Sequence, residues 1–200
     1  MKNLPIALLS VSLAFSSVSH AQTPAPNPAA TPATPIKPKA LSSSDRAVAT
    51  DILENVYLIG NLAQRVRGLR TTQPNLFPEE GWKAVEMAEK LQKEFWALVA
   101  PLSILSGDKL PEDVTAKDKK KLATLPSTAS VPDPKKARPK KGDFATEWAK
   151  LMTEQTKDLT KLIEKAGKSM DPQMSQLKTK QADAVKTLSS QFEKMASPAK

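Results

Sequence analysis

The side chains that could perform chemistry are carboxylates, lysines and hydroxyls, because the chain has no cysteine and its single histidine is His20. A di-iron carboxylate centre requires one glutamate on each of two helices and a Glu-x-x-His sequence on each of the other two. No Glu-x-x-His sequence follows His20, so we expect no metal site. The alternative is a carboxylate-only site for a hard cation. A solvated helix face is the simpler explanation of the candidate carboxylates Glu86, Glu89, Glu94, Glu147, Glu154 and Glu164.

No arrangement of residues typical of an enzyme is found. A serine or threonine nucleophile would need a lysine or another base within hydrogen-bond reach, and no motif surrounds any such pair. The six glycines are scattered singly, so no glycine-rich loop is present to bind a phosphate group. We expect no catalytic residue and no cofactor, and the sequence predicts a protein that is not an enzyme.

Two glutamines stand where apolar residues are expected. Gln155 interrupts the apolar stripe of one helical segment, and Gln181 interrupts the stripe of the next. If the chain turns near residues 169–170, the two amides lie within about one helical turn of each other. The simpler interpretation is a buried, hydrogen-bonded pair that fixes the register of the two helices. This interpretation predicts that Gln155→Leu leaves the fold intact or stabilises it.

The elements that position these side chains are four amphipathic helices, expected at residues 43–69, 79–100, 143–168 and 172–196. Apolar residues recur every three or four positions in each range, which places them on one face of a helix. The stripes of the last two ranges are Trp148, Met152, Leu159, Leu162 and Ala166, then Met174, Leu177, Ala184, Leu188 and Met195. Pro101 is expected to kink or end the second helix. Gly60 would allow a neighbouring helix to approach the first one closely.

A long connection, residues 101–142, separates the second helix from the third. One short helix is expected within it, near residues 115–122. The short connections elsewhere make each hairpin antiparallel, and the long crossover makes the second and third helices run parallel, as in ferritin-like bundles. The sequence therefore predicts an all-α fold over residues 42–196. We expect a ferritin-like four-helix bundle, in which two antiparallel hairpins are joined by a long basic crossover loop.

The N-terminal residues have the pattern of an export signal. In residues 1–21, Lys2 precedes a short apolar stretch, and Ser19-His20-Ala21 supplies small residues before a cleavage point, as in a secretory signal peptide. The apolar stretch is shorter than the ~20 residues that a membrane-spanning helix needs. We expect cleavage after Ala21, no transmembrane segment after cleavage, and a periplasmic or secreted protein. Residues 22–41, rich in proline, alanine and threonine, are expected to form a disordered tether.

Positive charge is concentrated in the crossover loop. Residues 117–141 contain nine lysines and arginines against Asp118 and Asp133. Clustered like charges attract polyanions, and the candidate anion-contact residues are Lys135, Lys136, Arg138, Lys140 and Lys141. In an exported protein the partner would be an anionic envelope surface of lipid head groups, lipopolysaccharide or wall polymers. Nucleic acid is not expected, since no aromatic side chains interleave the lysines. The alternative is a solvated loop that only keeps the protein soluble.

Several segments are similar to those of a known family. They are Gly107-Asp108-Lys109-Leu110-Pro111 leading into Ala116-Lys117-Asp118-Lys119-Lys120-Lys121-Leu122, then Asp143-Phe144 with Trp148 and Leu151-Met152, and Asp171-Pro172-Gln173-Met174 with Leu177. Over residues 45–195 the chain resembles a bacterial family of exported ferritin-like four-helix proteins of unknown function, often labelled "predicted outer membrane proteins". The resemblance implies a fold and a compartment, and it implies no reaction.

The chain departs from that family at its histidines. Members usually carry histidines at places that correspond to about Gln92, Gln155-Thr156 and Leu188, and none of these is histidine here. On the alternative interpretation, Gln155 and Gln181 are the remnant of a polar site whose histidines were lost. The first function that we expect is a non-enzymatic structural or interaction role in the cell envelope. The second is a ferritin-like bundle that binds a small ligand or a metal ion through carboxylates alone.

Overall fold

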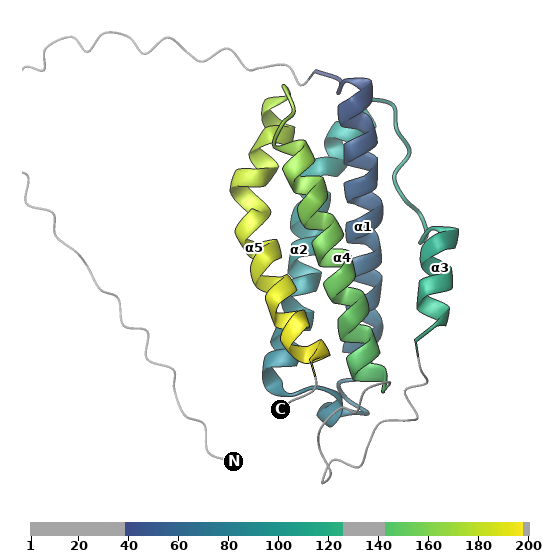
Figure 1. Ribbon diagram of the computed structural model, residues 1–200. Helices are drawn as coiled ribbons and strands as arrows, with labels where there is room; N and C mark the ends of the chain where they lie inside the picture. The colour runs from purple at the N-terminus through teal and green to yellow at the C-terminus, as the bar shows by residue number, and fades with distance from the viewer. Residues whose placement is uncertain (1–38, 126–142, 198–200) are drawn as a thin grey trace, which may run out of the picture. The chain divides into compact units, whose positions relative to one another are not determined.

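The computed structural model describes residues 39–125 and 143–197, and the regular elements within these two ranges are helices (Figure 1). They are α1 (Ser43–Arg67), a short 3-10 helix (Pro74–Leu76), α2 (Glu79–Leu105), α3 (Ala116–Ala123), α4 (Phe144–Ala166) and α5 (Pro172–Ala196). The all-α class predicted from the sequence is confirmed for these residues. The expected signal peptide lies outside them. None of the described helices has an apolar stretch of membrane-spanning length.

Side-chain caps begin four of the helices. The Oγ atom of Ser42 accepts a hydrogen bond from the amide of Asp45 at the start of α1 (3.2 Å), and Thr115 caps α3 in the same way. Asp143 and Asp171 cap α4 and α5 through their carboxylates. These caps satisfy first-turn amides that have no partner within the helix. α2 begins after Pro78 without a side-chain cap, and each long helix begins within one residue of the position expected from the sequence.

The four long helices pack side by side around one core (Figure 1). α1 contacts α2 and α4, and α5 contacts α4 and α2. α4 runs antiparallel to α1, because Trp148 donates from Nε1 to the Leu62 carbonyl (3.2 Å) while Gln155, further along α4, meets Asn55. α2 also runs antiparallel to α1, so α2 and α4 point in the same direction. The last turn of α2 and the first turn of α4 therefore lie at opposite ends of the helices.

Aromatic rings link the helices where α4 begins. Trp148 is fully buried, with its ring centroid 5.3 Å from that of Phe192 on α5 and 5.1 Å from that of Phe77 before α2. Phe77 in turn lies edge-on to Trp82 of α2 at 5.2 Å. Each ring pair at such a separation stabilises by about 0.5–1.5 kcal/mol beyond its buried area. Trp148 thus connects α4 directly to α1 and α5, and through Phe77 to α2.

Pro101 does not end α2, which continues to Leu105. A proline within a helix lacks the amide that would bond to the carbonyl four residues earlier, here that of Ala97. Both Pro101 and Ala97 are exposed, so water can bond to that carbonyl. The expectation that the helix stops near residue 100 is therefore wrong, because the lost hydrogen bond lies on the solvent side.

The buried face of α5 differs from the expected stripe in its second half. Beyond Gln181, the face passes through Val185, Leu188 and Phe192. Ala184 and Met195, which were expected on this face, are only partly buried. Spacings of three and four residues allow both stripes. The observed one buries the larger side chains, including the Phe192 ring that contacts Trp148.

Gly60 lets α2 approach α1 closely, as the sequence predicted. A Cβ atom at this position would lie 2.7 Å from Cγ and 2.9 Å from Cδ of Gln92 on α2. Carbon atoms pack at about 3.5–4.0 Å, so a side chain at residue 60 would force Gln92 to move. The Gln92 side chain therefore occupies the space that a side chain at residue 60 would need.

We predict that Gly60→Ala is compatible with this spacing only when the Gln92 side chain is shortened. In the Gln92→Ala background the added methyl group has room, and alanine should stabilise the helix by about 1 kcal/mol relative to glycine. With Gln92 present, overpacking should make the same change at least about 1 kcal/mol less favourable. Denaturant unfolding of the wild type, both single variants and the double variant measures this coupling. Equal effects of Gly60→Ala in the two backgrounds would contradict the close contact.

Candidate functional site

The side chains singled out from the sequence fall in separate parts of the molecule. Gln155 lies in α4 and Gln181 in α5, and both are buried. Glu94, expected on a solvated face, lies partly buried on α2 next to Gln181. Outside the described residues lie the basic candidates Lys135, Lys136, Arg138, Lys140 and Lys141. The part of the basic segment 117–141 that the structure describes with regular structure is α3, which carries four lysines.

The two glutamines bond to different helices. Oε1 of Gln155 accepts a hydrogen bond from Nδ2 of Asn55 on α1 (3.3 Å), and Nε2 of Gln181 donates to the carboxylate of Glu94 on α2 (3.4 Å). Among the described residues, the expected pair of Gln155 with Gln181 is replaced by these two separate bonds. The reason is the rotation of the helices, since each glutamine lies on the side of its helix that faces the other hairpin.

The other places at which the similar family carries histidines are occupied by packing residues. Gln92 lies against Gly60, and Leu188 is fully buried and apolar. The hydroxyl of Thr156 donates to the carbonyls of Met152 (2.9 Å) and Thr153 (3.1 Å) in its own helix. A threonine hydroxyl bonded in this way is satisfied without a partner from another helix. Of this set, Gln155 is the residue with a fully buried side-chain atom, Nε2, that has no hydrogen-bond partner among the described residues.

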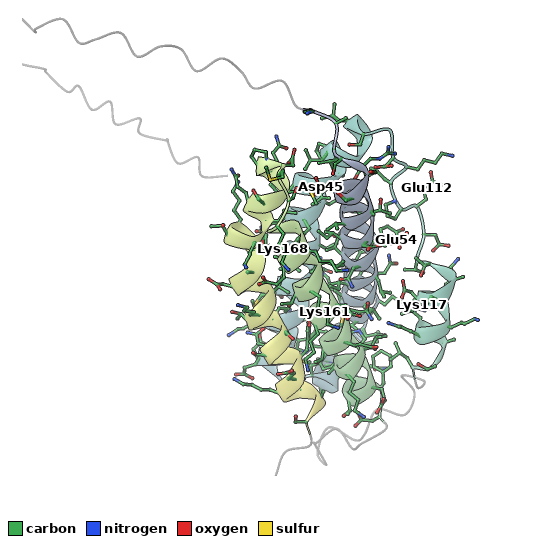
Figure 2. The ribbon with its side chains drawn as sticks, turned by 45° about the horizontal axis from the view of Figure 1, so that its top comes forward. Asp45, Glu54, Glu112, Lys117, Lys161 and Lys168 are labelled. Carbon is green, nitrogen blue, oxygen red and sulfur yellow. The ribbon has the colours of Figure 1, made fainter. Side chains whose placement is uncertain are left out.

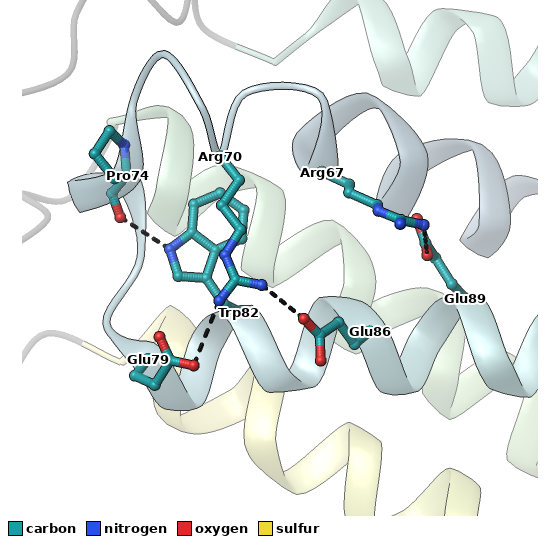
Figure 3. Close-up of polar contacts among 7 residues, drawn as sticks. All are labelled: Arg67, Arg70, Pro74, Glu79, Trp82, Glu86 and Glu89. Carbon is teal, nitrogen blue, oxygen red and sulfur yellow. Dashed lines mark hydrogen bonds and ion pairs between the residues drawn. The ribbon is translucent and has the colours of Figure 1, made fainter. Parts of the chain in front are cut away.

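Ion pairs join the end of α1 to the start of α2 (Figure 3). The Arg70 guanidinium lies over the Trp82 ring, 5.4 Å from its centroid, and donates to Glu86 (2.6 Å) and Glu79 (3.4 Å). Trp82 donates from Nε1 to the Pro74 carbonyl (2.9 Å). This arrangement fixes the turn between the two helices. Because Arg70 already binds two carboxylates, we assign the cluster to structure rather than to anion binding.

Glu89 is the second carboxylate of this hairpin that the structure places differently from the sequence-based expectation. It is only 8% exposed, and Arg67 donates to its Oε2 at 2.8 Å. The solvated position expected for Glu89 is therefore wrong, since a carboxylate can be buried when a guanidinium lies next to it. Arg67 is likewise bound to this carboxylate instead of extending freely from the end of α1.

α3 is held against α1 and α4. Tyr57 of α1 donates from its hydroxyl to the carbonyl of Glu112 just before α3 (2.8 Å), and Lys121 of α3 pairs with Glu154 of α4 (3.8 Å). The apolar side chains of this segment that pack against the core are Leu110, Val114, Leu122 and Leu125. The short helix expected near residues 115–122 is thus present, and it forms a wall beside the two long helices.

A groove of about 330 Å³ lies between α1, α3 and α4. Asn55 of α1 and Gln155 of α4 line its buried side. In Figure 2, Glu54 lies between α1 and α3, and Lys117 and Lys161 come from α3 and α4. The groove therefore brings together polar side chains from three helices, and we take it as the candidate site.

Carboxylates from two helices meet in this groove. Burial, and then repulsion from Asp51 on the same helix and Asp118 on α3, raise the pKa of Glu54 above its usual range. The Asp118 carboxylate accepts a hydrogen bond from the Thr115 hydroxyl (2.7 Å). None of the three carboxylates forms an ion pair with a described residue. The spacing of apolar residues could not predict that these carboxylates share a groove. The sequence indicated only the short helix that carries Asp118, and it did not indicate which helix this one would lie beside.

No group of three or more histidine, cysteine, aspartate or glutamate side chains in the described ranges is placed to hold a metal ion. Asp51, Glu54 and Asp118 share the groove without forming such a group. Comparison of the chain with protein-family models, with curated proteins and with solved structures finds no match.

We predict that Gln155→Leu changes the free energy of unfolding little or raises it. The substitution removes one long hydrogen bond to Asn55, with a net value of about 0.5–1.5 kcal/mol, and a buried N–H group without a protein partner, with a cost of about 1–3 kcal/mol. Denaturant unfolding of the wild type and the variant measures the difference. A loss of several kcal/mol would show instead that the Gln155 amide holds the helices in register.

Proposed function

We propose that the chain is an exported, non-enzymatic helical-bundle protein of the cell envelope that contacts an anionic surface through its Lys/Arg-rich segment. The observation that carries the proposal is the concentration of positive charge in residues 117–141, where nine basic residues oppose two acidic ones. Lipid head groups, lipopolysaccharide phosphates and acidic wall polymers present fixed negative charge in an envelope. A basic segment is attracted to such surfaces over a distance set by the salt concentration.

The described part of this segment supports the proposal. α3 carries four lysines against Asp118, and Lys117, Lys119 and Lys120 are exposed. Of these, Lys119 pairs with Asp113, whereas Lys117 and Lys120 form no ion pair with a described residue. Apolar side chains anchor the same segment to the core. An anionic surface bound by the segment would therefore be coupled to the whole bundle.

We also propose that the four long helices form a ferritin-like bundle with a crossover between α2 and α4. The shared direction of α2 and α4 supports this topology, since an up-and-down bundle would oppose them. The length of chain from Ser106 to Asp143 supports it as well. Membership of the exported four-helix family that the sequence resembles rests on this layout together with the similar segments.

Export of the chain is supported by the pattern of residues 1–21, and we predict that a Gram-negative host removes them. The purified protein should have the mass of residues 22–200 and be found in the periplasm or the medium. Ala21→Leu should block cleavage, because signal peptidases require a small residue at the cleavage point. Intact-mass spectrometry of both proteins after cell fractionation provides the measurement. An unprocessed wild-type chain retained in the cytoplasm would contradict the proposed export.

We predict that the processed chain binds vesicles that contain phosphatidylglycerol and does not bind vesicles of phosphatidylcholine alone. Glutamine at the five loop positions Lys135, Lys136, Arg138, Lys140 and Lys141 should weaken this binding at least about tenfold, since each basic residue near an anionic surface contributes up to about 1 kcal/mol. Co-sedimentation at low and at physiological salt gives the partition coefficients. Binding of the wild type should weaken as salt is added.

A matched control separates the position of the charge from its total. It replaces by glutamine five lysines that are exposed on the long helices and form no ion pair with a described residue, Lys83, Lys93, Lys180, Lys186 and Lys194. This variant has the same net charge as the loop variant and should keep most of the binding. Equal losses in the two variants, or no binding by the wild type, would refute the proposed contact.

A further inference from the structure

The groove between α1, α3 and α4 has a buried side that is polar and incompletely hydrogen-bonded. Gln155 is 3% exposed, and its Nε2 has no hydrogen-bond partner among the described residues. Oδ1 of Asn55 is also buried there without a described partner. A buried amide in this state is unfavourable unless another molecule completes its bonds. Gln155 lines the groove, so a small movement of its side chain would bring the buried Nε2 to an acceptor on a molecule bound there.

The walls of the groove present charges of both signs that are not neutralised by described residues. Asp51 and Glu54 extend from α1, and Asp118 from α3, without an ion-pair partner in the described ranges. Lys117 of α3 and Lys165 of α4 line the same groove and also lack an ion-pair partner in those ranges. Asp51 and Asp118 lie near enough to Glu54 to repel its charge, so negative charge gathers between α1 and α3 and fits a positively charged group with N–H donors.

The two signs of charge are balanced around the groove. Its lining contains the carboxylates of Asp51, Glu54, Asp118 and Asp158 and the ammonium groups of Lys117, Lys121, Lys161 and Lys165. A bare cation would use only the first set, and a bare anion only the second. A neutral molecule with one positive and one negative end uses both sets. The volume of about 330 Å³ lies at the lower end of ligand sites, which span about 300–1,000 Å³, and it suits a small molecule.

We propose that this groove binds a small zwitterion of the amino acid class. The ammonium group of the ligand donates hydrogen bonds to the carboxylate of Glu54, and the nearby carboxylates of Asp51 and Asp118 add negative charge that attracts it. Its carboxylate faces the lysines of the rim and accepts from the Nε2–H of Gln155, which the side chain exposes by a small movement when the ligand binds. Charge-assisted hydrogen bonds of this kind are stronger than those between neutral groups. The wall formed by α3 closes one side of the site, so the binding pocket depends on the anchoring of this short helix.

This ligand site is independent of the proposed envelope contact. None of the residues at positions 135–141 takes part in it, and no membrane or polymer is needed for binding. The vesicle experiment can therefore fail while the ligand experiment succeeds, and the reverse is equally true. The site also differs from the carboxylate-only metal site considered for the interior, because it lies in a groove beside α3 and requires an organic ammonium group.

Isothermal titration calorimetry of the processed chain tests the proposal, with the full set of protein amino acids as probes. Methylammonium and acetate, each of which carries only one of the two charges, serve as comparison probes. We expect at least one amino acid to bind, and neither single-charge probe to bind at the same concentration. No binding by any amino acid, or equal binding by methylammonium or acetate, would overturn the proposal.

Two pairs of variants test the assigned contacts. Gln155→Leu removes the amide donor of the site, and Gln181→Leu makes the same change at a buried glutamine that does not line the groove. Glu54→Gln removes one carboxylate of the site, and Glu80→Gln makes the same change at an exposed residue of α2. Thermal melts without ligand establish that each variant is folded.

We expect the affinity for the bound amino acid to fall at least about tenfold in both Gln155→Leu and Glu54→Gln, and to stay unchanged in the two controls. Retention of the wild-type affinity in either site variant would overturn the assignment. If Gln155→Leu did not fold, Glu54→Gln and its control would decide, because a change from carboxylate to amide preserves the shape of the side chain.

Discussion

The indole of Trp148 is fully buried and contacts three other parts of the bundle at once. Its Nε1 donates to the Leu62 carbonyl on α1, and its ring lies against Phe192 on α5 and Phe77 before α2. A buried indole is stable when it has both apolar surroundings and an acceptor for its N–H group. Trp148 finds both near the end of α1. Because Trp148 stands near the start of α4, this contact requires α4 to run antiparallel to α1. The direction of α4 is therefore tied to the burial of one side chain.

Because α4 runs parallel to α2, the end of α2 and the start of α4 lie at opposite ends of the helices. α3 follows α2 in the chain and lies beside α1 and α4 (Figure 1). About two turns beyond Trp148, α4 brings Gln155 next to Asn55. α3 passes the same level and adds Asp118. The groove therefore forms where α3 lies beside α1 and α4 at the level of Gln155.

The helices could be predicted from the sequence because their signals are local. Apolar spacing and the caps at Ser42, Asp143 and Asp171 determine where they begin. The partners of Gln155 and Gln181 could not be predicted, since they depend on how far each helix is rotated about its axis. The groove was missed for a related reason, because Glu54 and Asp118 are distant in the sequence and neither belongs to a motif that indicates ligand binding. Local patterns identify a helix, and its neighbours are decided by packing.

The two buried glutamines differ in a way that bears on their role. Gln181 donates to Glu94 and has no buried side-chain atom without a partner, as a residue that fixes helix register should. Gln155 keeps an Nε2–H without a partner in the described residues. It lines the same groove as Glu54, a carboxylate whose pKa is raised by burial and by like charges. A leucine at position 155 would avoid the cost of burying an N–H group without a partner. A glutamate placed far from Asp51 and Asp118 would not have its pKa raised by their negative charge. Polar groups held in unfavourable surroundings on one side of a groove are what a binding site requires, because the ligand supplies the interactions that the fold leaves incomplete.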